Sequence, residues 1–80
     1  MSFKEELKKA RLSAFLTQKG LAEQTGLSLG SIKNWERGNY LPSTTAWESL
    51  CDFFMYRTSF KELNKEYLLE KTQRGKTYGK

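Results

Sequence analysis

The side chains best suited to chemistry in this sequence lie close together, between Ser28 and Arg37. Lys33, Asn34 and Arg37 can donate hydrogen bonds, and the Asn34 amide can also accept them. A lysine, an amide and an arginine on one exposed helix suit the major groove of DNA, where base edges present donors and acceptors. Taken alone, the same three residues fit an ordinary solvated helix face equally well.

Other kinds of chemistry have few candidate residues. The 80-residue chain holds no histidine and one cysteine, Cys51, which is interpreted as a small apolar core residue. Catalysis by histidine is therefore excluded, and a zinc site of the usual ligands is not expected. The nine acidic residues are scattered among lysines, with no glycine-rich phosphate loop nearby. We expect no enzyme activity, no cofactor and no metal.

The composition also indicates the cellular compartment in which the protein is expected. A single cysteine excludes an internal disulfide, which fits the reducing cytoplasm. No apolar run approaches the length of a membrane span, and the N-terminal segment MSFKEELKKA lacks the apolar core of a signal peptide. We therefore expect a cytoplasmic protein of one small domain, with no membrane partner.

The net charge of +5 is concentrated at the C-terminal end. An acidic partner such as nucleic acid would explain a basic segment there, and a solvated tail without a partner explains it equally well. We expect residues 1–70 to form the folded domain and residues 71–80 a flexible, disordered tail. The basic residues of this tail, which contains no acidic residue, are Lys71, Arg74, Lys76 and Lys80.

Two short helical patterns carry the candidate side chains. Thr17 is a good N-cap for the first, which ends at Gly26, and Ser28 caps the second, which ends at Gly38. Helices this short are not stable alone in water, so they must pack on each other and on the remaining chain. Two of them joined by a tight turn are typical of the helix-turn-helix arrangement.

Small and apolar residues predict how these two helices sit. Ala22 lets them cross closely, while Ile32 and Trp35 point the second helix toward the core. The positions expected to face away from the core are Leu29, Gly30, Lys33, Asn34 and Arg37.

Three further helices complete the expected all-α domain of five short helices. Ser2 with Glu5 and Ser59 with Glu62 fit capping boxes at the first and last helices. The first helix should end near Ser13, and Ser43 or Thr44 should cap the fourth. The apolar positions at helical spacing are Phe3, Leu7, Ala10, Ala14, Trp47, Leu50, Cys51, Phe54, Phe60, Leu63 and Tyr67.

With these residues in place, the chain resembles the lambda-repressor/Cro (XRE) family of bacterial and phage DNA-binding domains. The segments WERG and LP stand in that family's usual places, and the resemblance covers roughly residues 3–70. It implies a compact lambda-repressor-like fold and a sequence-specific transcriptional regulator, a repressor of the phage or mobile-element kind. The residues at that family's spacing are Gln18, Ala22, Gly26, Ile32 and Trp35.

The resemblance also implies roles for single residues. Gln18 looks like the family glutamine that bonds a DNA phosphate beside a helix N-terminus. Arg11 and Glu36 match a family ion pair that ties the first helix to the third. The positions expected to face bases are Ser28, Leu29, Gly30, Lys33 and Asn34. Those expected to meet phosphates are Thr17, Gln18, Lys19, Arg37 and Asn39.

Leu29 and Gly30 depart from the family, whose best-known members carry polar side chains at these positions. Leucine offers only apolar contact, for example to a thymine methyl, and glycine offers close approach of the backbone. Direct readout then rests on Asn34, which can bond adenine twice, and Lys33, which can reach guanine. Gly20 is also unusual, since glycine inside a helix costs about 1 kcal/mol relative to alanine; close approach to a neighbour or to DNA would explain it.

The segment CDFFMYRTSF holds more large apolar side chains than one inward stripe needs. Phe53, Tyr56 and Phe60 form a second stripe, which we interpret as the interface of a two-fold homodimer, as the resemblance also suggests. The alternative is that the last helix folds over these residues. The expected partner of a homodimer is double-stranded DNA with a palindromic operator.

Two other functions stay open at this stage. One is an antitoxin-like or other protein-interaction module that carries a helix-turn-helix, which a co-purifying second polypeptide would favour. The other is a helical scaffold without a DNA role, which failure to bind any DNA would favour.

Overall fold

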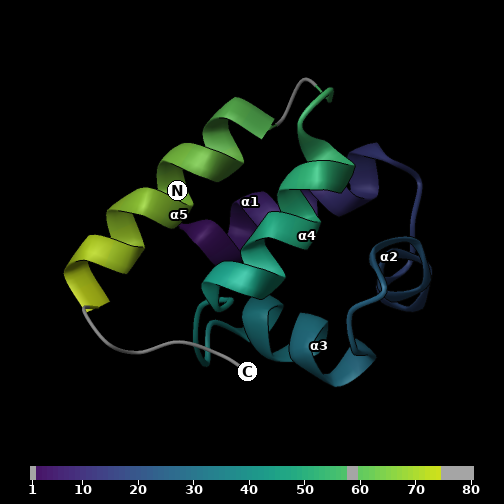
Figure 1. Ribbon diagram of the computed structural model, residues 1–80, viewed down its shortest axis with the longest axis horizontal. Helices are drawn as coiled ribbons and strands as arrows, with labels where there is room; N and C mark the ends of the chain where they lie inside the picture. Colours follow the sequence, from purple (N-terminus) through teal and green to yellow (C-terminus); the bar gives the residue numbers. More distant parts are fainter. Residues whose placement is uncertain (1, 58–59, 75–80) are drawn as a thin grey trace.

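The structure, a computed structural model, describes residues 2–57 and 60–74. Within these residues the chain forms five helices and no strand, so the prediction of an all-α fold is confirmed. Figure 1 shows α3 below α4, with α5 on the opposite side of α4 from α2. The helices are α1 (Phe3–Ser13), α2 (Gln18–Thr25), α3 (Leu29–Arg37), α4 (Thr44–Phe54) and α5 (Phe60–Arg74).

Helices α1 to α4 begin at the predicted capping residues. In each, the hydroxyl oxygen of the N-cap accepts the backbone N–H three residues further on, and at Ser2 the Glu5 carboxylate completes the capping box. The second predicted box lies partly outside the described residues, since it involves Ser59. The observed N-caps are Ser2, Thr17, Ser28 and Ser43.

Gly26 and Gly38 end α2 and α3, as predicted. Their φ angles are 75° and 81°, in the left-handed region that side chains with a Cβ rarely adopt. Because only residues 26–28 separate the end of α2 from the start of α3, the two helices are joined by the tight turn that the sequence predicts.

The glycine at position 20, inside α2, is explained by the close approach of two neighbouring side chains. A Cβ at this position would lie 3.2 Å from Leu16 Cδ2 and 3.3 Å from Thr17 Oγ1. That hydroxyl oxygen accepts the Gly20 N–H at 2.9 Å, so the first turn of α2 is tightly packed around its cap.

Helix α5 is longer than predicted. We expected the domain to end at residue 70, where the apolar pattern lapses, but α5 continues to Arg74. Lysine, glutamine and arginine are good helix formers, and each added residue gains a backbone hydrogen bond. A helix can therefore continue beyond the last apolar residue of its pattern. The Lys71 ammonium lies 5.8 Å from the centre of the Tyr67 ring. The tail prediction is therefore wrong for residues 71–74, and residues 75–80 lie outside the described residues.

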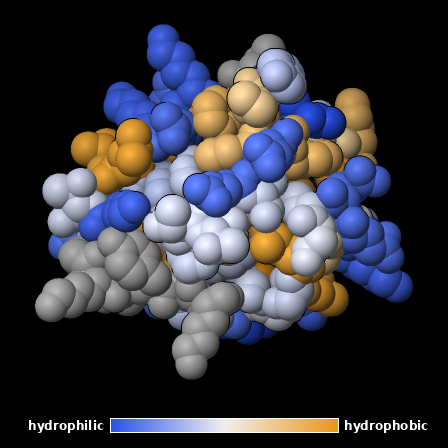
Figure 2. All heavy atoms as spheres, in the orientation of Figure 1, coloured by the Kyte–Doolittle hydropathy of each residue, from blue (hydrophilic) through white to orange (hydrophobic). Residues whose placement is uncertain are grey.

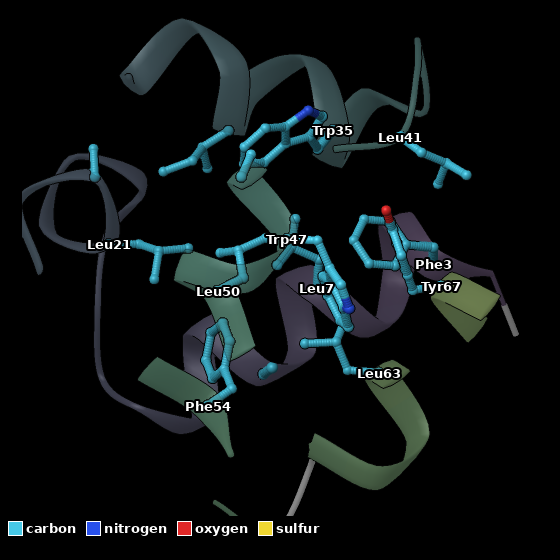
Figure 3. Close-up of a cluster of buried hydrophobic side chains, with 14 residues drawn as sticks. Phe3, Leu7, Leu21, Trp35, Leu41, Trp47, Leu50, Phe54, Leu63 and Tyr67 are labelled. Atoms are coloured by element: carbon cyan, nitrogen blue, oxygen red, sulfur yellow. The ribbon is translucent and has the colours of Figure 1, made fainter. Parts of the chain in front are cut away.

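The core is built around stacked aromatic rings. Trp47 lies near the middle of the cluster in Figure 3, with its ring centre 4.1 Å from that of Tyr67 and 5.8 Å from that of Phe3. The Tyr67 hydroxyl donates to the Pro42 carbonyl at 3.0 Å, which ties α5 to the loop after α3. The buried apolar residues are Phe3, Leu7, Ala10, Leu21, Ala22, Ile32, Trp35, Leu41, Ala46, Trp47, Leu50, Phe54, Leu63 and Tyr67.

Candidate nucleic-acid interface

Two fully buried side chains fix the rotation of α3. Ile32 and Trp35 are 0% exposed and pack into the core. Gly30 and Arg37 are exposed on the outer side, and Lys33 and Asn34 are partly exposed. The structure therefore places these four residues where solvent, or a ligand, can reach them.

Leu29 behaves differently from the prediction. It is partly buried and packs against the core cluster. Residues three apart lie on neighbouring sides of a helix, so Leu29 shares a side with the buried Ile32. The prediction that Leu29 faces away from the core is therefore wrong.

The Asn34 amide is held at both ends. Its Nδ2 donates to the Gly30 carbonyl oxygen at 2.9 Å, and its Oδ1 accepts a hydrogen bond from Asn39 Nδ2 at 2.7 Å. Asn39, which is predicted to meet a phosphate, contacts the predicted base-reading residue in the free protein.

Arg11 and Glu36 form the predicted ion pair between α1 and α3. Arg11 Nε lies 2.8 Å from Glu36 Oε2, and Arg11 Nη2 lies 3.1 Å from Glu36 Oε1. Both side chains are buried, being 9% and 5% exposed. Arg11 Nη1 also donates to the Leu16 carbonyl at 2.8 Å, so the pair holds the turn that leads into α2.

Gln18 joins this pair. Its Nε2 donates to Glu36 Oε1 at 3.2 Å, so the first residue of α2 is tied directly to α3. Thr17 and Lys19 on either side are exposed. The first N–H groups of a helix have no partner within the helix and attract anions. The N-terminus of α2 therefore offers donors at a position fixed relative to the face of α3.

The remaining predicted contacts lie at the two ends of α3. Ser28 is exposed, and its hydroxyl accepts the Ser31 N–H at 3.1 Å and donates to Ser31 Oγ at 2.8 Å. It therefore caps α3 in the free protein. Arg37 lies in the last turn of α3, where its cationic side chain is exposed.

The predicted dimer stripe is only partly open. The Arg57 guanidinium covers the Phe53 ring at 4.1 Å, and the Phe60 ring lies parallel to that of Trp47 with centres 6.4 Å apart. Tyr56 is 88% exposed and Met55 is 47% exposed. Figure 2 shows apolar side chains gathered near this C-terminal end of α4.

The Cys51 thiol and the Glu5 carboxylate have pKa values that differ from their ordinary ones. Burial raises the pKa of the Cys51 thiol, as do the nearby charges of Asp52 and Glu48, which favours an unreactive thiol. The pKa of Glu5 is lowered because its carboxylate accepts hydrogen bonds from the Ser2 backbone and hydroxyl. Across residues 2–57 and 60–74, no group of three potential ligands could hold a metal ion. No helix in this part of the chain is long and apolar enough to cross a membrane.

The bonds of Gln18 to Glu36 and of Asn34 to Asn39 are not among the contacts predicted from the sequence. The bond between Gln18 and Glu36 joins different helices, so no local pattern could show it. The bond between Asn34 and Asn39 had a local signal, because a left-handed Gly38 folds the following residue back over the end of the helix.

Comparison with known proteins agrees with this arrangement. A family model described as a helix-turn-helix domain matches residues 3–59, which include all of α1 to α4. No curated protein and no solved structure matches the chain significantly. The matched residues make up more than half of the sequence, and the chain therefore belongs to this DNA-binding helix-turn-helix family.

Proposed function

We propose that the chain is a sequence-specific transcriptional regulator of the lambda-repressor/Cro type, acting as a repressor of the phage or mobile-element kind. Its α3 inserts into the major groove of double-stranded DNA. The observation that carries this proposal is the Arg11–Glu36–Gln18 cluster, which fixes the N-terminus of α2 beside α3. The cluster thereby fixes the hydrogen-bond donors for a DNA phosphate relative to the base-reading face of α3.

The proposed contacts divide into two kinds. Asn34 reads adenine and Lys33 reaches guanine, while Gly30 lets the backbone approach the base edges. The α2 N-terminus, through Gln18, and the exposed Arg37 meet phosphates and set the position of α3 on the duplex. No catalytic step is part of this function.

We further propose that the protein binds a palindromic operator as a homodimer. The exposed Tyr56 and its neighbour Met55 supply the accessible part of the interface. Phe53 and Phe60 contribute less, because contacts within the chain already cover part of their rings. A two-fold dimer would present two copies of α3 to successive major grooves.

A second candidate is a helix-turn-helix module that also binds a protein. Leu68 and Leu69 favour it, since they are 52% and 46% exposed on α5. Co-purification of a stoichiometric second polypeptide that is lost on Leu68→Ser would support this candidate.

Selection of bound sequences from a random DNA pool tests the proposal. The expected product is an inverted repeat whose half-sites lie about 34–36 Å apart, or a multiple of that spacing. A matched selection with the Lys33→Ala, Asn34→Ala protein should enrich little, since both side chains lie on the outer face. Absence of any enriched sequence would rule out sequence-specific binding, and a single unrepeated site would rule out the dimer.

A further inference from the structure

We propose that Asn39 is a positioning residue that orients the Asn34 amide, and that the preference of α3 for adenine depends on this pair. The inference rests on the proposed function, in which Asn34 reads the base. It assigns Asn39 a role in specificity in place of the phosphate contact predicted from the sequence.

The cap of α3 brings Asn39 to Asn34. Gly38 adopts a φ of 81°, which turns the chain back over the last turn of the helix. The Asn39 backbone N–H then donates to the Asn34 carbonyl oxygen at 3.0 Å, and the Asn39 side chain donates to Asn34 Oδ1 at 2.7 Å. Two bonds between the same residues hold the Asn39 side chain in place.

Gly30 and Asn39 hold the Asn34 amide from its two sides, and the direction of the bonds follows from the Gly30 carbonyl. It can only accept, so the Asn34 amide must turn its Nδ2 toward it, at 2.9 Å. Asn34 Oδ1 then faces Asn39, which must offer its own Nδ2. Reversing either amide would bring two acceptors or two donors together. The orientation of both side chains is therefore determined in the free protein.

The bonds used leave a readable edge on Asn34. An amide nitrogen has two donor hydrogens and an amide oxygen has two lone pairs. Asn34 uses one of each, so its amide keeps one donor and one acceptor. Adenine presents the matching pair in the major groove, N7 as acceptor and the N6 amino group as donor.

Fixing the amide matters more for discrimination than for affinity. A freely rotating amide can present its oxygen to the cytosine amino group or its nitrogen to guanine, and so tolerates wrong bases. Asn39 is exposed, and Asn34 is only partly buried, so their bond is not part of the core. Its loss should change base preference while the fold is retained.

Asn39→Ala tests the role in two measurements, with Asn64→Ala on α5 as a matched control. In the free protein, ¹⁵N relaxation of the Asn34 side-chain amide reports its order. We expect the order parameter to fall in Asn39→Ala and to stay unchanged in the control. An unchanged value in Asn39→Ala overturns the positioning role, whatever DNA binding shows.

Competition binding to the selected operator and its single-base variants is the second measurement. We expect Asn39→Ala to lower the preference for adenine at one base pair per half-site by at least about fivefold, the lower end for one bidentate contact. Affinity for unrelated DNA should stay the same. A uniform loss for all sequences would show a phosphate contact instead and overturn the inference.

The double variant separates this inference from the proposed function. If Asn39 acts through Asn34, adding Asn39→Ala to Asn34→Ala should change base preference no further. A further loss would show that Asn39 acts independently. If Asn34→Ala leaves base preference intact while the amide order still depends on Asn39, the proposed reading role fails and the inference fails with it.

Discussion

Glu36→Ala should destabilise the domain far more than an ordinary surface substitution. Glu36 holds two nitrogens of Arg11 and the amide of Gln18, and its side chain is 5% exposed. Among the residues that the structure describes, its removal leaves the buried Arg11 with one acceptor, the Leu16 carbonyl. Removing one partner of a buried ion pair costs about 3–5 kcal/mol of stability, because the charge of the other partner is left uncompensated.

This magnitude is large for a domain of this size. A stability of about 0.05–0.15 kcal/mol per residue gives an 80-residue chain roughly 4–12 kcal/mol. With about 4–8 °C lost per kcal/mol, the melting temperature should fall by at least about 12 °C. Glu23→Ala on the exposed side of α2 is the matched control and should change stability by less than about 0.5 kcal/mol.

A double-mutant cycle checks the cause. Arg11→Met removes the other charge, and combining it with Glu36→Ala should cost less than the two single changes together. The assay is urea unfolding of the four proteins, followed by circular dichroism. The role of the ion pair would be refuted if the losses in unfolding free energy were additive. It would also be refuted if Glu36→Ala melted at the same temperature as the wild type.

Three further predictions concern other parts of the chain. Gly30→Ala should raise the melting temperature, because the added Cβ would have no atom within 4 Å besides its chain neighbours and the nearby backbone of α3, and alanine gains roughly 0.5–1 kcal/mol in a helix. Gly20→Ala, where the Cβ would meet Leu16 at 3.2 Å, should gain less; equal gains would contradict the packing argument. The lowered pKa of Glu5 means that its carboxylate stabilises the fold above its ordinary pKa of 4.5, and that this contribution is lost as the pH falls through the lowered value. Thermal melts should therefore separate the wild type from Glu5→Gln near neutral pH and bring them closer at about pH 2; a constant separation would contradict this. Deleting residues 75–80 removes two lysines and should flatten the log–log salt dependence of DNA binding by up to about 1.8 without changing the preferred sequence. An unchanged slope would show that these residues do not meet phosphates.

Local signals explain why most of the fold was predictable. Thr17 and Ser28 can satisfy helix N-termini with their own hydroxyls, and Gly26 and Gly38 can adopt the left-handed backbone that ends a helix. Each of these effects acts within about four residues. The boundaries of α2 and α3 are therefore visible in the sequence.

The errors arise where packing or side-chain orientation decides. The outward prediction for Leu29 rests on Ile32 and Trp35 as the inward positions, but its spacing from Ile32 places it against the core. The end of α5 was assigned from the lapse of apolar residues, although helix propensity carries it to Arg74. Gly38 indicates that Asn39 returns over the end of α3, but the bond between Asn34 and Asn39 also depends on the direction of two amides, which composition and spacing do not express.

The central claim is that α3 reads bases while the N-terminus of α2 meets phosphates. Competition binding of the wild type, Asn34→Ala and Gln18→Ala to the selected operator and its single-base variants tests it at one fixed salt concentration. Asn34→Ala should lose about 1–3 kcal/mol of discrimination at one base pair per half-site. Gln18→Ala should weaken binding to all sequences alike, since a phosphate contact carries no base information. If both proteins keep their melting temperature and neither change alters binding, α3 is not the recognition helix.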